Sequence, residues 1–193
     1  MNTIDSIRKA LEAGKTSEAI REALRLATRA GQTELARWYR LELGGYVASN
    51  SAMSEDVIVP DYRSVVGQHR DLYGHLFAPG PDLEFINETR LRNGVEELEQ
   101  LACSKDTVSI HDPHLCQIIR DNLNVEVYSF TFSSTHVVGI LSAIRSEFED
   151  RLAQSLPIAE RDADSEEEVL ILRPNFYGIG LNLRSLWRRM SGK

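Results

Sequence analysis

The chain has 193 residues, 42% of them hydrophobic, so it can bury a core as one domain or one domain with an appendage, and wholesale disorder is excluded. Its formal net charge of -7 argues against a surface that binds nucleic acid along its whole length, because contacts to phosphate need concentrated lysine and arginine. The two cysteines, Cys103 and Cys116, suit a reducing compartment, where each is expected to be a small buried side chain. With no signal-peptide pattern and no apolar run of about 20 residues, a cytoplasmic protein is predicted.

Three short helices are predicted in the first 45 residues. Apolar residues recur at helical spacing in two stripes, and each stripe is followed by a glycine that suits a helix C-terminus, Gly14 or Gly31. A third helix carries ELARWYRLELGGY, residues 34–46, with Thr33 as its N-cap and Gly44 as its end. Together these helices predict a small bundle.

The next part of the chain is rich in strand-forming residues. Residues 57–77 hold many valines and aromatic residues, broken by one proline and two glycines, which predicts a hairpin that begins with an edge strand or a strand end. Residues 87–102 are predicted to be helical, with Gly94 as a point of interruption or restart. Residues 107–110, TVSI, are a short strand candidate.

A short helix, a strand and a long helix follow. Asp112 as N-cap and Pro113 in the first turn begin a helix in DPHLCQIIRDNL. Residues 124–132 alternate between two faces and predict the clearest strand of the chain. Ser133 or Ser134 then caps a helix that is expected to end before Pro157. Its core-facing stripe consists of Val137, Leu141, Ile144, Phe148 and Leu152.

The predicted fold class is α+β, with an N-terminal helical bundle packed on a small, mainly antiparallel sheet, a long late helix, and a C-terminal strand and basic helix. The predicted divisions are a domain over residues 1–156, an acidic linker or loop over residues 157–168, and a basic amphipathic tail over residues 169–193.

The tail concentrates arginine, leucine and tryptophan, a composition that suits a docking surface. It is expected to bind its own chain, a second copy in a homo-oligomer or another protein, with anionic membrane and nucleic acid as less favoured alternatives. The residues expected to bind the partner are Leu183, Arg184, Trp187, Arg188 and Arg189.

Three segments occur in an order that resembles the AbiTii domain family, which is named after a component of a bacterial abortive-infection system against phages. They are LARWYRLELGGY at residues 35–46, VPDYRSVVG at residues 59–67, and the late helix at residues 133–154. The resemblance covers residues 1–155 and implies a role near phage defence or toxicity, without implying a reaction. It also implies that a protein partner of the tail would be another defence protein. The positions that carry its motifs are Trp38, Glu42, Leu43, Gly45, Tyr46, Tyr62 and Arg63.

One acidic residue breaks the pattern of the third helix. At roughly 100° per residue, Glu42 falls about 20° from Leu35, inside the apolar arc. A buried carboxylate needs a partner, and Arg63 of the second motif can hold it with two hydrogen bonds, so a structural pair is predicted. A ligand-binding or catalytic role for Glu42, or a side chain that reaches solvent, stays open.

Two other groups of polar residues carry weaker chemical hypotheses. His111, Asp112, His114 and Cys116 are metal-capable, but they match no zinc spacing, so no metal site is predicted. His69 and His75 flank the hairpin and, with Arg70 and Asp71, could line a hydrolytic pocket, although exposed turn residues are the simpler interpretation.

These observations predict a non-enzymatic interaction or regulatory module in a bacterial anti-phage or toxicity system. The alternative is a cryptic toxic effector enzyme such as a nuclease, using Glu42, Arg63, His69 or His75. No catalytic motif names a reaction, and no P-loop or dinucleotide fingerprint is present, so no cofactor is expected.

Overall fold

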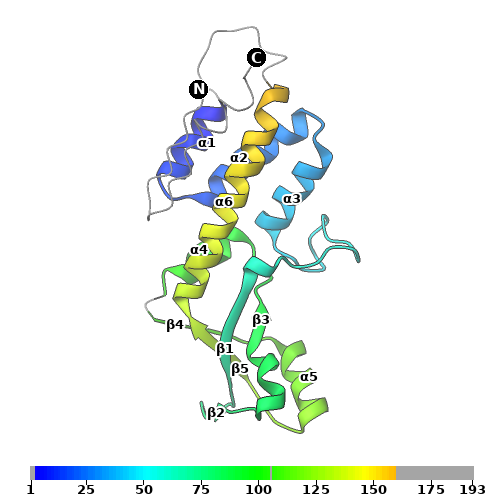
Figure 1. Ribbon diagram of the computed structural model, residues 1–193, viewed down its shortest axis with the longest axis vertical. Helices are drawn as coiled ribbons and strands as arrows, with labels where there is room; N and C mark the ends of the chain where they lie inside the picture. The colour runs from blue at the N-terminus through cyan, green and yellow to red at the C-terminus, as the bar shows by residue number, and fades with distance from the viewer. Residues whose placement is uncertain (1–2, 105, 160–193) are drawn as a thin grey trace. The chain divides into compact units, whose positions relative to one another are not determined.

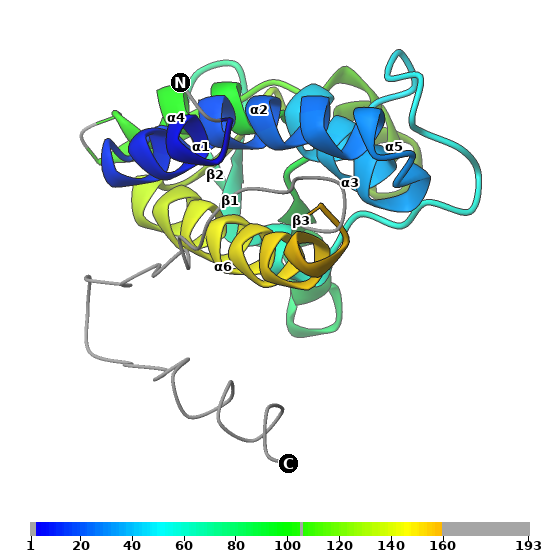
Figure 2. The ribbon, with the colours of Figure 1, turned by 90° about the horizontal axis from the view of Figure 1, so that it is seen from above.

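Three helices open the chain in the computed structural model, which describes residues 3–104 and 106–159 (Figure 1). They are α1 (Thr3–Glu12), α2 (Thr16–Arg29) and α3 (Thr33–Gly44), as the apolar stripes predicted. Adjacent helices of this series pack on one another, and the long helix α6 (Ser134–Ala159) lies in a second layer beside them (Figure 2). No helix in the described ranges is long and apolar enough to cross a membrane.

The turns between these helices use glycine where the backbone is left-handed. Gly14 and Gly31 have φ angles of +73° and +68°, which confirms their predicted places at the ends of α1 and α2. At α3 the expected positions are wrong by one residue. Gln32, not Thr33, is the N-cap, and Gly44 is still helical, because Gly45 takes the left-handed conformation with φ +76°.

The sheet is antiparallel throughout, with the order β2-β1-β5-β4 and with β3 paired to β1 beside β2. Its strands are β1 (Ser64–Arg70), β2 (Leu76–Phe77), β3 (Glu88–Arg90), β4 (Thr107–Ile110) and β5 (Ser129–Ser133). One face is buried and contains Phe130 and Phe132 of β5, which lie opposite His69 and Gly67 of β1. With the helices this gives an α+β fold, as predicted from the sequence.

Long-range pairing changes the predicted helix over residues 87–102. A short 3-10 segment, η2 (Pro81–Asn87), leads into β3, and helix α4 (Val95–Ala102) begins only after Gly94. The N–H of Leu91 donates to the carbonyl of Arg63 at 2.9 Å, so backbone groups that a helix would need are used between segments. The restart at Gly94 is confirmed, but the first part of the predicted helix is wrong.

The hairpin is confirmed, but its first residues are not a strand. A 3-10 turn, η1 (Asp61–Arg63), comes before β1, because the N–H of Arg63 donates back to the carbonyl of Pro60 at 3.1 Å. Strand β5 likewise begins later than predicted. Helix α5 (Pro113–Leu123) is followed by Asn124 with a φ of +54°, which interrupts the extended conformation.

Helix α6 is confirmed, with two corrections. The hydroxyl of Ser133 accepts from the N–H of Thr135 at 3.3 Å, which makes Ser133 the cap. Ile140 is buried where Leu141 was expected, and the helix continues past Pro157 to Ala159, since a proline in the last turn removes a single hydrogen bond. The predicted linker beyond residue 159 and the tail lie outside the described residues.

Both cysteines were expected to be buried, but neither is. Cys103 is exposed at the end of α4 and Cys116 is partly exposed on α5, and both are free thiols. Burial raises the pKa of the Cys116 thiol above its usual value. Cys103 is the residue that follows α4, and Cys116 lies one turn before Ile119, a buried position of α5, so the small apolar character of cysteine was not enough to predict full burial.

Candidate functional site

The end of α3, the η1 turn and the chain just after β3 enclose one buried polar cluster at the junction of the helices and the sheet (Figure 1). Glu42 and Arg63 meet there, with 2.5 Å between Arg63 Nη2 and Glu42 Oε2, and the side chains of both are 0% exposed. The structure thus brings together the two residues that the helical projection and the DYR motif singled out.

Two tyrosines complete the surroundings of the carboxylate. The hydroxyls of Tyr46 and Tyr62 both donate to Glu42 Oε1, at 2.7 and 2.6 Å. The Glu42 carboxylate therefore accepts three hydrogen bonds, from two hydroxyls and a guanidinium. We call Glu42, Tyr46, Tyr62 and Arg63 the Glu42 cluster. The sequence singled out Tyr46 and Tyr62 only as positions of the family motif, without a role as donors to Glu42.

The guanidinium of Arg63 also binds backbone. Its Nη1 donates to the carbonyl of Leu91 at 3.2 Å and to that of Asn93 at 2.7 Å, and its plane lies over the ring of Tyr46, 4.8 Å from the centroid. Its Nε has no hydrogen-bond partner within the described ranges. One arginine thus connects the helix carboxylate to the loop before α4, and the ring contact adds a cation–π interaction.

The hydroxyls of the cluster keep their protons. Burial, followed by the negative charge of Glu42, raises the pKa of Tyr46 far above its usual value. The pKa of Tyr62 is raised for the same two reasons, burial first. Both hydroxyls therefore remain donors over the whole neutral range, which is the state that Glu42 needs.

Two glycines allow the backbones around the cluster to touch. A Cβ on Gly45 would overlap the carbonyl oxygen of Arg92, and a Cβ on Gly94 would overlap that of Leu43. The N–H of Tyr46 donates to the same Arg92 carbonyl at 2.8 Å. The motif glycine is thus needed both for its left-handed backbone and for close approach. Leu43, another motif residue, is half-buried and contributes its backbone to this contact.

Trp38 lies apart from the Glu42 cluster, on the α6 side of α3. Its half-buried ring stacks under the guanidinium of Arg151, with 4.7 Å to the centroid, and meets Tyr39 edge-on at 5.4 Å. Tyr39 in turn packs against Phe148 of α6 at 5.7 Å. This motif position therefore holds α3 against the long helix.

The histidines of the hairpin lie in different environments. His75 is exposed, and its Nδ1 lies 2.8 Å from Asp71 Oδ2. His69 is buried on the covered sheet face, where its Nε2 lies 2.9 Å from the carbonyl oxygen of Ile86, so its prediction as an exposed turn residue is wrong. Because His69 follows Gly67 by two residues on a strand, its side chain shares the buried face. Arg70 donates to the carbonyl of Gly74 at 2.9 Å, within the turn.

The metal-capable residues at the start of α5 make contacts with nearby parts of the chain. Asp112 accepts from the N–H of Leu115 at 3.1 Å, which confirms it as the helix cap, and the rings of His111 and Tyr128 lie 4.6 Å apart. The side chain of His114 and the tail residues 183–189 lie outside what is described. No group of three metal-capable side chains occurs in the part of the chain that the structure describes.

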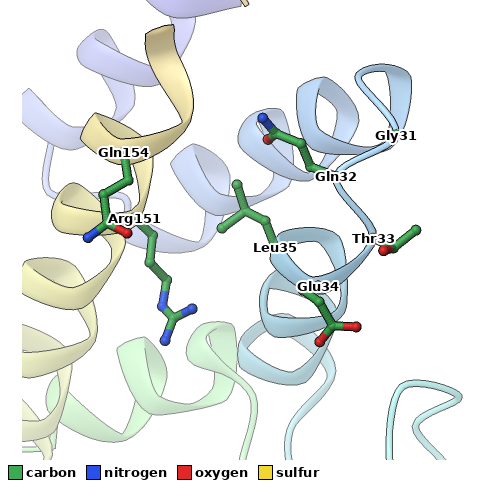
Figure 3. Close-up of a pocket in the computed structure, with 7 residues that line it drawn as sticks. All are labelled: Gly31, Gln32, Thr33, Glu34, Leu35, Arg151 and Gln154. Carbon is green, nitrogen blue, oxygen red and sulfur yellow. The ribbon is translucent and has the colours of Figure 1, made fainter. Parts of the chain in front are cut away.

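A pocket of about 450 Å³ opens between the start of α3 and the last turns of α6. Figure 3 shows Arg151 and Gln154 entering it from α6, with Leu35 facing them and Thr33 turned away. Sequence reasoning missed this pocket, because it depends on how two helices 116 residues apart meet. The pocket is wide-mouthed, and Arg151 is already engaged by Glu147 and Trp38, so it gives no chemical assignment.

Comparison with protein families gives a match over most of the chain. The family model AbiTii matches residues 2–165, a range that includes every described residue. No curated protein and no solved structure matches the chain significantly.

Proposed function

Because this chain belongs to the AbiTii family, we propose that it acts in bacterial anti-phage defence as a non-enzymatic interaction or regulatory module. The family membership associates the chain with abortive infection. The observation that supports a module over an enzyme is the complete burial of the Glu42–Arg63 pair.

A catalytic carboxylate must reach its substrate, at least through one water. Glu42 is enclosed, and three donors from its own chain already occupy its oxygens. Six of the seven motif positions lie in or beside the Glu42 cluster, and the seventh, Trp38, packs toward α6. The motif of the AbiTii resemblance thus supports a structural role for these residues. In this proposal, partner proteins bind to the outer surface of the domain.

The alternative effector enzyme needs its candidate residues in one accessible place. The structure distributes them over three environments: Glu42 and Arg63 in the buried pair, His69 on the covered face of the sheet, and His75 exposed on the hairpin. This distribution favours the module. We include the tail residues 183–189 in the proposal as a partner surface, on the composition of that segment alone.

A paired substitution distinguishes a structural role of Glu42 and Arg63 from a catalytic one. Glu42→Gln combined with Arg63→Met removes both charges but keeps an acceptor for the two tyrosines and the bulk of both side chains. We expect bacteria that express the paired variant to keep the reduction in plaque number given by the natural chain, provided that circular dichroism shows a folded protein. His75→Ala, an exposed position, is the matched control for the enzyme hypothesis.

Loss of protection by the folded paired variant, or by the folded His75→Ala variant, would contradict the module and favour an enzyme. Loss of protection by the destabilised Glu42→Ala single variant alone would agree with a framework role. If the natural chain itself gives no protection against a broad phage panel, the defence role is wrong.

A further inference from the structure

We propose that the free edge of β4 is a self-association surface, on which β4 of a second copy pairs antiparallel about a two-fold axis. The strand is Thr107–Ile110, at one end of the sheet order β2-β1-β5-β4. In the described ranges its partner is β5, on one side (Figure 1). This proposal is independent of the phage-defence role, since it rests on backbone geometry.

The hydrogen-bond pattern fixes which groups face the open side. The N–H of Ser134 donates to the carbonyl of Asp106 at 3.1 Å, and Thr107 lies opposite Ser133 in the next pair. Bonded and non-bonded pairs alternate along an antiparallel ladder, so Asp106, Val108 and Ile110 bond to β5. The N–H and C=O groups of Thr107 and Ser109 therefore point away from β5, toward the edge.

β4 is short, but it lacks the other protections that are common on edge strands. Its sequence, TVSI, contains no charged residue and no proline, and the side chains of Thr107 and Ser109 are exposed. Natural proteins commonly guard such an edge with lysine, proline or a bulge, because unpaired backbone groups form a template for another strand. A short edge with two outward residues and no charge or proline is suited to a short partner strand.

The strand is complementary to itself. Val108 and Ile110 lie on the buried face and Thr107 and Ser109 on the open face, so a continuous sheet must pair even-numbered residues with even-numbered residues. With Val108 facing Val108 of the partner at the axis, Thr107 of each copy faces Ser109 of the other. Both of those pairs are bonded pairs, which gives four backbone hydrogen bonds with no outward group of these residues left unused.

The neighbouring charges disfavour one alternative register. Sliding the partner by two residues would place Ser109 at the axis and set Asp106 of one copy opposite Asp112 of the other. Like charges directly opposite one another destabilise a strand pair. In the proposed register Asp106 faces Ile110 instead. Because only four residues take part, we expect a weak dimer whose population rises with protein concentration.

Sedimentation of the full chain at increasing concentration tests the surface. We expect a monomer–dimer equilibrium that Ser109→Pro abolishes, because proline removes an outward N–H and leaves the ladder with β5 intact. Ser109→Thr is the matched control and should dimerise normally. Since proline could disturb the strand, Ser109→Lys provides a second test, with Gln68→Lys on the same open face, but on β1, as the control for added charge.

The proposal is overturned if the natural chain is monomeric at all concentrations, or if its dimer persists in folded Ser109→Pro and Ser109→Lys proteins. Dimerisation that is lost equally in Gln68→Lys would also overturn it, because the effect would then be one of charge.

Cysteine pairing tests the register. In a background with Cys103→Ser and Cys116→Ser, one protein carries Thr107→Cys and a second carries Ser109→Cys. Under oxidation the mixture should give more cross-linked dimer than either protein alone, because residue 107 faces residue 109 across the interface. Stronger cross-linking of the Ser109→Cys protein with itself would contradict the proposed register.

Discussion

Glu42 is fully buried, so its carboxyl group depends on hydrogen-bond donors from its own chain. Removing one member of a buried, hydrogen-bonded pair leaves the other charge uncompensated, which costs more than the pair itself contributes. Arg63 would be that charge, with two of its bonds still directed at backbone carbonyls.

We therefore expect Glu42→Ala to lower the free energy of unfolding by about 3 to 5 kcal/mol. Urea denaturation followed by circular dichroism measures this change. Glu34→Ala, an exposed glutamate on the same helix, is the control and should change the free energy of unfolding by about 0.5 kcal/mol or less. An unfolding midpoint of Glu42→Ala equal to that of the natural chain would contradict the pair as an anchor.

Removal of the hydroxyl from two buried tyrosines should change the free energy of unfolding in opposite directions. The hydroxyl of Tyr39 is buried and has no hydrogen-bond partner within residues 3–104 and 106–159, whereas that of Tyr46 donates to Glu42. Burying an unpaired hydroxyl is costly, so Tyr39→Phe is expected to stabilise the fold by about 1 kcal/mol. Tyr46→Phe is expected to destabilise it by about 1.5 to 3 kcal/mol, because a bond to a charged acceptor is lost.

Thermal or urea midpoints of the two variants, measured side by side, decide the matter, since each substitution removes the same atom. If both variants are destabilised equally, Tyr39 has a partner that the described residues do not provide, and the distinction fails.

The close approach of Gly45 and Gly94 joins the end of α3 to the start of α4. Gly45→Ala introduces both a left-handed backbone with a Cβ and an overlap with the carbonyl of Arg92. We expect a loss of stability well above the roughly 1 kcal/mol that a left-handed alanine costs by itself. Gly14→Ala is the matched control, because it has nearly the same φ, +73°, and nothing within 4 Å of its Cβ. Equal unfolding midpoints for the two variants would contradict the close approach.

Helical periodicity made most elements predictable, because it is a local property of the sequence. The three N-terminal helices, α5 and α6 needed nothing beyond apolar spacing and capping residues. Strand β3 could not be found this way, since residues 88–90 are extended only through their pairing with β1, more than 20 residues earlier. For the same reason, the hydrogen bonds from the Arg63 side chain to backbone carbonyls could not be predicted, because their acceptors lie in a segment that was expected to be helical.

For the molecule as a whole, the buried tyrosines give unfolding an alkaline pH dependence. Burial raises the pKa of Tyr39 and of Tyr46 far above the value near 10 of an exposed tyrosine. The unfolded chain loses these protons first, so their contribution is complete below pH ~10 and decreases above it, by about 1.4 kcal/mol per pH unit for each tyrosine that ionises only when unfolded.

Urea midpoints between pH 9 and pH 11 measure this decrease. Tyr39→Phe should show a smaller decrease than the natural chain, because one of the contributing protons is gone, while Tyr73→Phe, an exposed position, should not differ from it. A decrease that is unchanged in Tyr39→Phe would contradict the assignment.

The family and the α+β class of the described residues could be predicted from sequence, since both rest on the order of motifs and elements. The position of Glu42 on an apolar arc and the presence of an arginine in the second motif were enough to name a candidate pair. The tyrosine donors were missed because Tyr46 lies beyond the end of α3 and Tyr62 lies in a turn predicted as a strand start. The tail and its expected partner residues remain predictions.

The Glu42 cluster also bears on the order in which the chain folds. Its members come from α3, from Tyr46 just after α3 and from η1, and Arg63 also donates to the carbonyls of Leu91 and Asn93. The carboxylate and its arginine therefore have all their partners only when contacts spanning some fifty residues have formed. The helices α1, α2 and α3 meet through neighbours in sequence and can assemble sooner, because short loops close at lower entropic cost. Substitutions at Glu42 should then accelerate unfolding more than they slow folding. The contacts of this carboxylate would therefore form after the folding nucleus, late in folding.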